Sequence, residues 1–275
     1  MARRLHQAGH TVHAWNRTQS KADPLAALGI AVHATVAEAV RQADIVVSLL
    51  ENGPAVEHVL FHAGAAQAMR TGTLFIDMAS IQPREARDHA ARLGEMGLAH
   101  LDAPVSGGTV GAENGTLAIM AGGRAEDFAR AQPVFAALGR ATHVGPHGSG
   151  QLAKLANQMI VGITIGAVAE ALLFAAKGGA DMAKVREAIQ GGFADSRILQ
   201  LHGQRMVDRD FAPKARMGVQ LKDMRNALGT AKEIGFDAPV TTLFEALYAE
   251  GVEHGLGELD HSGLFVELAS RNAMQ

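Results

Sequence analysis

The periodicity of this 275-residue chain changes near Gly145–Gly148, and that change constrains the fold more than any other feature. Before it, short apolar runs alternate with amphipathic stretches, whereas after it almost every segment has helical spacing. The expected strands are Thr11–Trp15, Asp44–Leu50, Thr73–Asp77, Leu98–Asp102 and Thr116–Ala121. Strands alternating with helices predict a parallel sheet with helices on both faces. We therefore expect an α/β domain over residues 1–147 and an all-helical domain over residues 148–275.

The expected helices differ in length between the two halves. The first half should contain Ser20–Leu28, Val36–Gln42 and Arg84–Met96, and the second Ser149–Lys177, Met182–Gln190, Gly218–Ile234, Pro239–His254 and Ser262–Ser270. Glycines after Lys177 are the expected terminator of a very long interdomain helix. No long helix separates the last two strands, so those strands are expected to depart from parallel order. A junction between two domains is a favoured place for a ligand.

Composition excludes several classes of protein. The net charge is −3 and the chain has no cysteine, so nucleic-acid surfaces, disulfides and thiol nucleophiles are not expected. The segment Met159–Ala176 is apolar, but Glu170 interrupts it, and we interpret it as a helix buried inside protein, not a membrane span. A cytoplasmic protein with no nucleic-acid or membrane partner is expected.

The beginning of the chain reads as the second half of a βαβ unit. Residues 1–8 resemble the last turns of a helix closed by Gly9, and the following strand ends in Asn16-Arg17-Thr18. We expect a dinucleotide-binding (Rossmann-like) domain, truncated so that its first strand and glycine-rich phosphate loop are missing, with weak cofactor binding as a result. The alternative is a domain that starts with a helix. Because the tripeptide has a cation and no acid, NADP is favoured over NAD. The alternative is a solvated turn with an ordinary surface arginine.

The segment from Asp102 to Gly108 is the first candidate site. Pro104 prevents continued central pairing after the strand, and Ser106, Gly107 and Gly108 expose backbone N–H groups that suit a carboxylate or phosphate. The alternative is a plain glycine turn.

Lys154 and Asn157 are the second candidate site. They are three residues apart in the long helix, so their side chains share one face. A desolvated lysine can lose its proton near neutral pH and act as an acid or a base. The alternative is a lysine whose stem lies along apolar surface at a domain seam. Lys222-Asp223, in a later helix, reads by itself as a solvated charge pair.

Taken in order, these segments resemble the β-hydroxyacid dehydrogenase family, which includes 3-hydroxyisobutyrate dehydrogenases, over essentially the whole chain. The resemblance implies that Lys154 is the catalytic proton donor in NAD(P)H-dependent reduction of a small aldehyde acid. It also implies supporting roles: Asn157 orients the substrate or the lysine, while the substrate is bound by Ser106, Gly107, Gly108 and Lys222. The implied cofactor-binding residues are Asn16, Arg17, Thr18, Leu49, Leu50, Ser80, Lys222 and Asp223.

Two segments narrow the resemblance. Lys154–Gln158 and Leu256–Ser262 look most like tartronate semialdehyde reductases, which interconvert tartronate semialdehyde and glycerate. A 3-hydroxyisobutyrate dehydrogenase or a succinic or glyoxylic semialdehyde-type reductase remains an alternative. So does a cofactor-deficient, non-enzymatic oligomerisation module. The small-residue helix 159–176 suggests a homodimer or homotetramer.

A metal site is not expected. His58 and His62 are four apart and would share a helix face, but the zincin pattern is absent and no third ligand is evident.

Overall fold

A computed structural model describes residues 1–274, and the chain divides into two compact units, Met1–Lys154 and a second beginning at Leu155. The strands, all in the first unit, are β1 (His13–Ala14), β2 (Ala31–Val32), β3 (Ile45–Ser48), β4 (Leu74–Asp77), β5 (Ala99–Asp102), β6 (Val105–Ser106), β7 (Leu117–Gly123) and β8 (Gly139–Gly145). Its helices and helical turns are α1 (Ala2–Gln7), η1 (Gln19–Lys21), η2 (Asp23–Leu28), α2 (Val36–Val40), α3 (Gly53–Glu57), η3 (His58–His62), α4 (Ala65–Ala68), α5 (Pro83–Glu95), α6 (Gly108–Asn114) and α7 (Ala125–Leu138).

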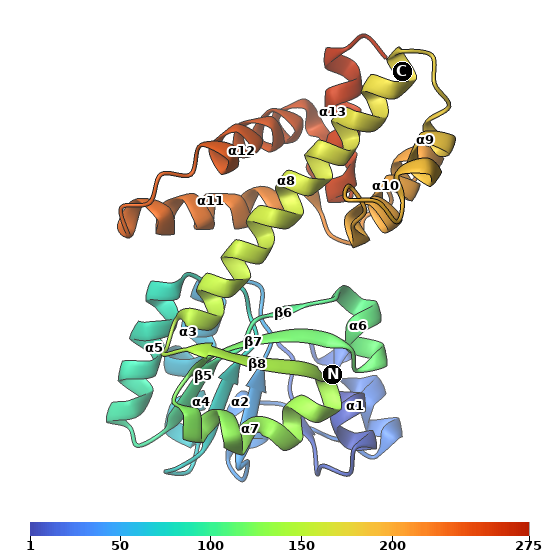
Figure 1. Cartoon of the computed structure of the whole chain (residues 1–275). Coiled ribbons are helices and arrows are strands. Elements are labelled where there is room, and N and C mark those ends of the chain that lie inside the picture. Colours follow the sequence, from blue (N-terminus) through green and yellow to red (C-terminus); the bar gives the residue numbers. More distant parts are fainter. Residues whose placement is uncertain (275) are drawn as a thin grey trace. The chain divides into compact units, whose positions relative to one another are not determined.

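The larger sheet has the order β3-β4-β5-β7-β6, and β8 pairs with β7 (Figure 1). Strands β3, β4 and β5 are parallel, and their register places Asp77 opposite Asp102. Strand β7 runs antiparallel to β5 and β6, which confirms the expected departure from parallel order. The carboxyl ends of β3, β4 and β5 therefore meet at one edge, where α/β folds bind ligands.

Strands β1 and β2 form a separate parallel pair. Every residue of β3 is half-buried, whereas every residue of β4 is buried, so β3 is an edge of the larger sheet in the described part of the chain.

Both faces of the larger sheet are covered. Along β4, Phe75 packs in a cluster with Val56, Leu60 and Leu93, while the alternate residue Ile76 packs in a second cluster. Helix α7 contributes to the second cluster through Ala131, Val134, Phe135 and Leu138. Because successive strand residues face opposite sides of a sheet, helices lie on both faces, as predicted.

Two expectations for the first unit need correction. Ser20–Leu28 is two short 3₁₀ turns, η1 and η2, instead of an α-helix; Pro24 lacks an N–H and Gly29, with φ +83°, ends the segment. The sequence analysis also missed α7, a 14-residue helix that contains Pro133. A proline normally marks a helix end, so its presence obscured the pattern.

The second unit is helical, and α8 (Ser149–Lys177) has the bounds that the sequence predicts. It is followed by α9 (Met182–Ile189), α10 (Arg197–Asp208), α11 (Met217–Glu233), α12 (Pro239–Gly251), η4 (Val252–Leu256), η5 (His261–Gly263) and α13 (Leu264–Arg271). Helices α11 and α12 lie side by side (Figure 1). Helix α10 was not predicted.

Helix α8 is the one described segment long and apolar enough to cross a membrane. Its Ile165, Ala169 and Leu172 are buried in the core of the helical unit, as the sequence analysis expected. Its Ile160 and Phe174 are 66% and 80% exposed.

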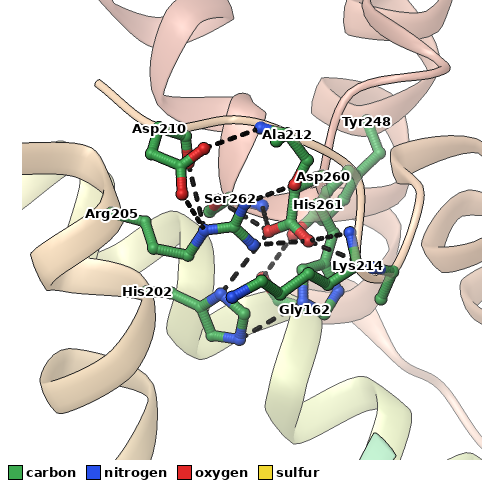
Figure 2. A network of polar contacts seen from close by, with 11 residues as sticks. Gly162, His202, Arg205, Asp210, Ala212, Lys214, Tyr248, Asp260, His261 and Ser262 are labelled. Carbon is green, nitrogen blue, oxygen red and sulfur yellow. Dashed lines mark hydrogen bonds and ion pairs between the residues drawn. The ribbon is translucent and has the colours of Figure 1, made fainter. Parts of the chain in front are cut away.

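A buried aspartate joins three segments of the helical unit (Figure 2). Asp260 accepts hydrogen bonds from the backbone N–H groups of Lys214 and Ala215, at 3.2 and 3.0 Å, and from the Ser262 hydroxyl at 2.7 Å. Arg205 Nη1 of α10 lies 2.9 Å from its Oδ2. These contacts fix the loop that leads into α11, the helix that carries Lys222.

Candidate functional site

The start of α8 is fixed by a buried carboxylate at the end of β5. Asp102 Oδ1 accepts the Gly148 N–H at 2.8 Å and its Oδ2 accepts the Gln151 N–H at 2.9 Å. These are N–H groups that the first turn of a helix cannot satisfy itself. A Cβ at Gly150 would lie 2.3 Å from the Asp102 carbonyl oxygen, so only glycine lets the helix approach the strand this closely.

A second buried carboxylate lies next to this one. Asp77 accepts the Ala79 N–H at 3.0 Å through Oδ1, and its Oδ2 has no hydrogen-bond partner among the described residues. Burial, together with the negative charge of the neighbouring Asp102, raises the pKa of Asp77 to about 7, although the hydrogen bond from the Ala79 N–H opposes that effect. Burial also raises the pKa of Asp102 to about 6, although the N–H bonds from Gly148 and Gln151 oppose that effect.

Gln151 connects the first turn of α8 to the loop after β4. Its fully buried side chain accepts the Ile81 N–H at 3.0 Å and donates to the Ala79 carbonyl at 2.8 Å. Those two groups flank Ser80, a predicted cofactor residue. Gln151 therefore holds the Ser80 segment against the helix that carries Lys154, a role the sequence analysis missed because the partners are some 70 residues away in the chain.

Lys154 lies in the early part of α8 and is only 8% exposed. Asn157 is three residues further along the same helix and half-buried, so both side chains project from one helix face, as predicted. A buried lysine on a helix whose start is fixed at the strand ends suits proton transfer.

The segment Ser106-Gly107-Gly108 joins β6 to α6 in the first unit. Gly107 and Gly108 have φ values of +133° and +63°, which side chains rarely adopt. The positive φ values turn the backbone sharply into α6, and no Cβ covers the N–H groups there. The loop is therefore more than a plain surface turn and retains the features of an anion-binding segment.

Lys222 and Asp223 are not the solvated pair that their sequence alone favours. Lys222 Nζ lies 3.1 Å from Asp223 Oδ1, and the Asp223 side chain is only 6% exposed. Asp223 Oδ2 accepts a hydrogen bond from Gln158 Nε2 at 2.7 Å, and Gln158 Oε1 accepts one from Asn157 Nδ2 at 2.8 Å. The structure therefore brings Asn157, Lys222 and Asp223 into one network.

The predicted cofactor residues of the first unit follow the carboxyl ends of strands. Asn16-Arg17-Thr18 follows β1, and Asn16 Oδ1 accepts the Thr18 N–H at 2.9 Å. Arg17 is exposed, and the turn contains no carboxylate. Leu49, 54% exposed, and Leu50 follow β3. An exposed guanidinium without a competing acid fits the 2′-phosphate of NADP.

Two clusters within residues 1–274 have ligand atoms close enough to face a metal ion: His100, Asp102 and His147, and His202, Asp260 and His261. In both, the carboxylate already accepts backbone N–H groups. Arg205 also lies beside Asp260, and its charge opposes a cation. His58 and His62 stack with ring centroids 5.9 Å apart and belong to neither cluster.

Comparison with known proteins decides the family. Residues 1–145 match the model for the NAD-binding domain of 6-phosphogluconate dehydrogenase, and residues 148–268 match the model for NAD-binding of NADP-dependent 3-hydroxyisobutyrate dehydrogenase. The chain belongs to the 3-hydroxyisobutyrate dehydrogenase family. Members of this family are NAD(P)-dependent oxidoreductases, and the chain is one of them.

Three relatives of this family member cover most of both chains. It is 43% identical to 2-hydroxy-3-oxopropionate reductase of Escherichia coli (strain K12), over 96% of this chain and 91% of that protein. It is 35% identical to the probable 3-hydroxyisobutyrate dehydrogenase-like 1, mitochondrial, of Arabidopsis thaliana, over 99% and 82%. The solved structure of Mycobacterium tuberculosis 3-hydroxyisobutyrate dehydrogenase with L-serine is 31% identical, with a TM-score of 0.89 over 97% and 94%. The fold predicted from the sequence is confirmed.

Proposed function

We propose that this chain reduces tartronate semialdehyde, which is 2-hydroxy-3-oxopropionate, to glycerate with NADPH. The observation that carries the proposal is Lys154, buried in a helix whose first turn is fixed by Asp102 and Gln151. The 43% identity to the reductase of E. coli supports this substrate. The alternative substrates are 3-hydroxyisobutyrate and succinic or glyoxylic semialdehyde, since relatives with 3-hydroxyisobutyrate dehydrogenase names match 99% and 96% of the chain.

The chemical step needs a proton at the carbonyl oxygen. The reduced nicotinamide, when bound, supplies the hydride that adds to the aldehyde carbon, and the carbonyl electron pair moves to oxygen. The Lys154 ammonium stabilises the developing charge and donates a proton to that oxygen. Asn157 orients the substrate or the lysine. In the oxidative direction Lys154 accepts the hydroxyl proton.

The remaining site residues bind and orient. The N–H groups of Ser106, Gly107 and Gly108, with the Ser106 hydroxyl, hold the substrate carboxylate. Lys222 adds a cation for substrate and cofactor, and Asp223 holds Lys222 at 3.1 Å. Leu49, Leu50 and Ser80 line the cofactor side at the strand ends. Arg17, with Asn16 and Thr18, would accept the 2′-phosphate of NADP.

A substrate panel with both cofactors tests the proposal. Tartronate semialdehyde, succinic semialdehyde, glyoxylate and 3-hydroxyisobutyrate would each be assayed with NADPH or NADH, or the oxidised forms. We expect the highest kcat/KM for tartronate semialdehyde with NADPH. A higher kcat/KM for 3-hydroxyisobutyrate would favour the alternative substrate. Absence of turnover with every acid of the panel would contradict the proposal. Cofactor saturation would be checked by titration.

We also propose a cytoplasmic homodimer or homotetramer. The exposed Ile160 and Phe174 of α8 leave apolar surface that a second copy could cover. Mass measurement in solution distinguishes these states, and a monomer at micromolar concentration would contradict the proposal.

A further inference from the structure

Two helices of the second unit are joined by a chain of amide and carboxylate groups. Gln158 of α8 lies at its centre, half-buried, between Asn157 on its own helix and Asp223 of α11. Gln220 of α11, only 1% exposed, donates its Nε2 to the Gln158 backbone carbonyl at 3.0 Å. Its Oε1 lies 3.4 Å from Gln158 Nε2. Each contact is between groups that lie inside or near the candidate site.

The chemistry of the partners sets the direction of these hydrogen bonds. A carboxylate and a backbone carbonyl only accept. Asp223 therefore requires the NH₂ of Gln158, and the carbonyl of residue 158 requires the NH₂ of Gln220, which turns Gln220 Oε1 toward Gln158 as a second acceptor. Both contacts demand the same orientation of the Gln158 amide.

The orientation of Gln158 then fixes that of Asn157. With its NH₂ directed at Asp223, Gln158 can offer only its carbonyl oxygen to Asn157, so Asn157 must donate through Nδ2. The Asn157 carbonyl oxygen lies on the opposite branch of its amide and is turned away from Gln158. Asn157 can therefore offer this oxygen as an acceptor.

We propose that Gln158 and Asp223 are positioning residues that fix the Asn157 amide, so that its carbonyl oxygen accepts a hydrogen bond from the substrate hydroxyl or the Lys154 ammonium. This inference rests on the proposed reductase function and deepens it. It also changes the role of Asp223, which the family resemblance placed in cofactor binding. The Asp223 side chain is 6% exposed and contacts Gln158 and Lys222, so it acts through its neighbours.

A charge swap tests the direction of the network. Gln158→Glu places a second carboxylate against Asp223 and should lower kcat/KM for the aldehyde acid by about 10- to 100-fold, the effect expected when a charged hydrogen bond is replaced by repulsion. In the double variant Gln158→Glu/Asp223→Asn, the new carboxylate at position 158 accepts hydrogen bonds from the Asn157 amide and from the new amide at position 223. The orientation of the Asn157 amide is therefore kept. We expect the double variant to recover about tenfold over Gln158→Glu.

Gln158→Met provides the matched control, because methionine keeps the length and removes both polar groups. It should lower kcat/KM for the aldehyde acid by about tenfold, and leave KM for the cofactor within about threefold. Adding Asp223→Asn to Gln158→Met should bring no recovery. Two results would overturn the inference. One is a kcat/KM of Gln158→Glu/Asp223→Asn no higher than that of Gln158→Glu, and the other is an equal gain in kcat/KM when Asp223→Asn is added to Gln158→Met.

Melting temperatures of the same variants separate this inference from the proposed function. The swap should recover part of the melting temperature lost in Gln158→Glu, whatever the substrate. If wild-type protein turns over no acid but the melting temperature recovers, the proposed function fails while the network stands as a structural one. If wild-type protein is active, and neither kcat/KM nor the melting temperature recovers in Gln158→Glu/Asp223→Asn, the network inference alone is wrong.

Discussion

Asp102 in the first unit and Asp260 in the second are both fully buried, yet their surroundings differ in charge. Asp260 lies 2.9 Å from an arginine, and although burial alone would raise its pKa, the nearby His202, 3.6 Å away, and hydrogen bonds from Ser262 and Ala215 hold that pKa well below the usual range. Asp102 accepts backbone N–H groups, and burial raises its pKa to about 6.

The difference shows two ways of using a buried carboxylate. Asp260 forms a buried ion pair with Arg205 and, through its hydrogen bonds, holds the loop before α11 in place. Asp102 caps a helix, and the partial positive charge of the helix start replaces a full cation. The first arrangement serves stability, and the second fixes the start of α8, the helix of the proposed proton donor Lys154, at the place where the strands end.

Removing the Asp260 carboxylate should have the largest effect on the free energy of unfolding. Asp260→Ala removes the buried partner of Arg205, which keeps Asp210 at 3.7 Å, and frees the loop N–H groups, so we expect a loss of about 3–5 kcal/mol in the free energy of unfolding. Because the pKa of Asp260 is lowered in the folded state, its contribution is complete at neutral pH and declines as the pH falls below about 4. Denaturant titration measures both effects. Asp208→Ala, at an exposed position of α10, is the control, and equal losses in the two variants would contradict the comparison.

Asp77, the buried carboxylate beside Asp102, should give the free energy of unfolding the opposite pH dependence. The folded protein holds a proton on Asp77 up to about pH 7, whereas the unfolded chain releases it near pH 4. The free energy of unfolding should therefore fall as the pH rises between these values, by up to about 4 kcal/mol. Asp77→Asn cannot ionise and should lack this decline. Parallel pH curves for the two proteins would contradict the raised pKa.

Asp102→Asn should have a smaller effect on stability. One oxygen still accepts an N–H, but an NH₂ group then faces the other, which costs about 1–3 kcal/mol. Because the helix start also carries Lys154, kcat should fall while KM for the cofactor changes little. Asp44→Asn is a control at a side chain that is 94% exposed. A larger loss of stability than in Asp260→Ala would reverse the comparison.

Periodicity and end signals were enough to predict the elements that matter most. The bounds of α8 were correct because a long apolar pattern begins after glycines and ends at two more. Helix α10 was missed although Ser196 caps it, accepting the Leu199 N–H at 3.0 Å, since the segment before it has no regular pattern. Helix α7 was missed because Pro133 predicts a helix end, whereas the helix continues through that residue to Leu138.

The site was predictable only where its residues share a local pattern. The helix face that Lys154 shares with Asn157 follows from helical spacing, and the glycine turn at Ser106–Gly108 follows from its position after a strand, whereas the roles of these residues come from the family resemblance and stay predictions. The contacts of Gln151 with Ala79 and Ile81, and of Gln158 with Asp223, join segments more than 60 residues apart. Such pairs depend on how strands and helices pack, and a single sequence contains no local signal for them.

The most direct test is the turnover of Lys154→Ala, with Lys177→Ala as the control on the same helix, under saturating NADPH and tartronate semialdehyde. Loss of a general acid should lower kcat by about 10²–10⁴-fold, and the melting temperature should stay close to that of the wild-type protein. Lys177, in the last turn of α8, donates to the Asn272 carbonyl at 3.0 Å, and its removal should leave kcat within about twofold. Near-full activity of Lys154→Ala would remove Lys154 from proton transfer and contradict the proposed mechanism.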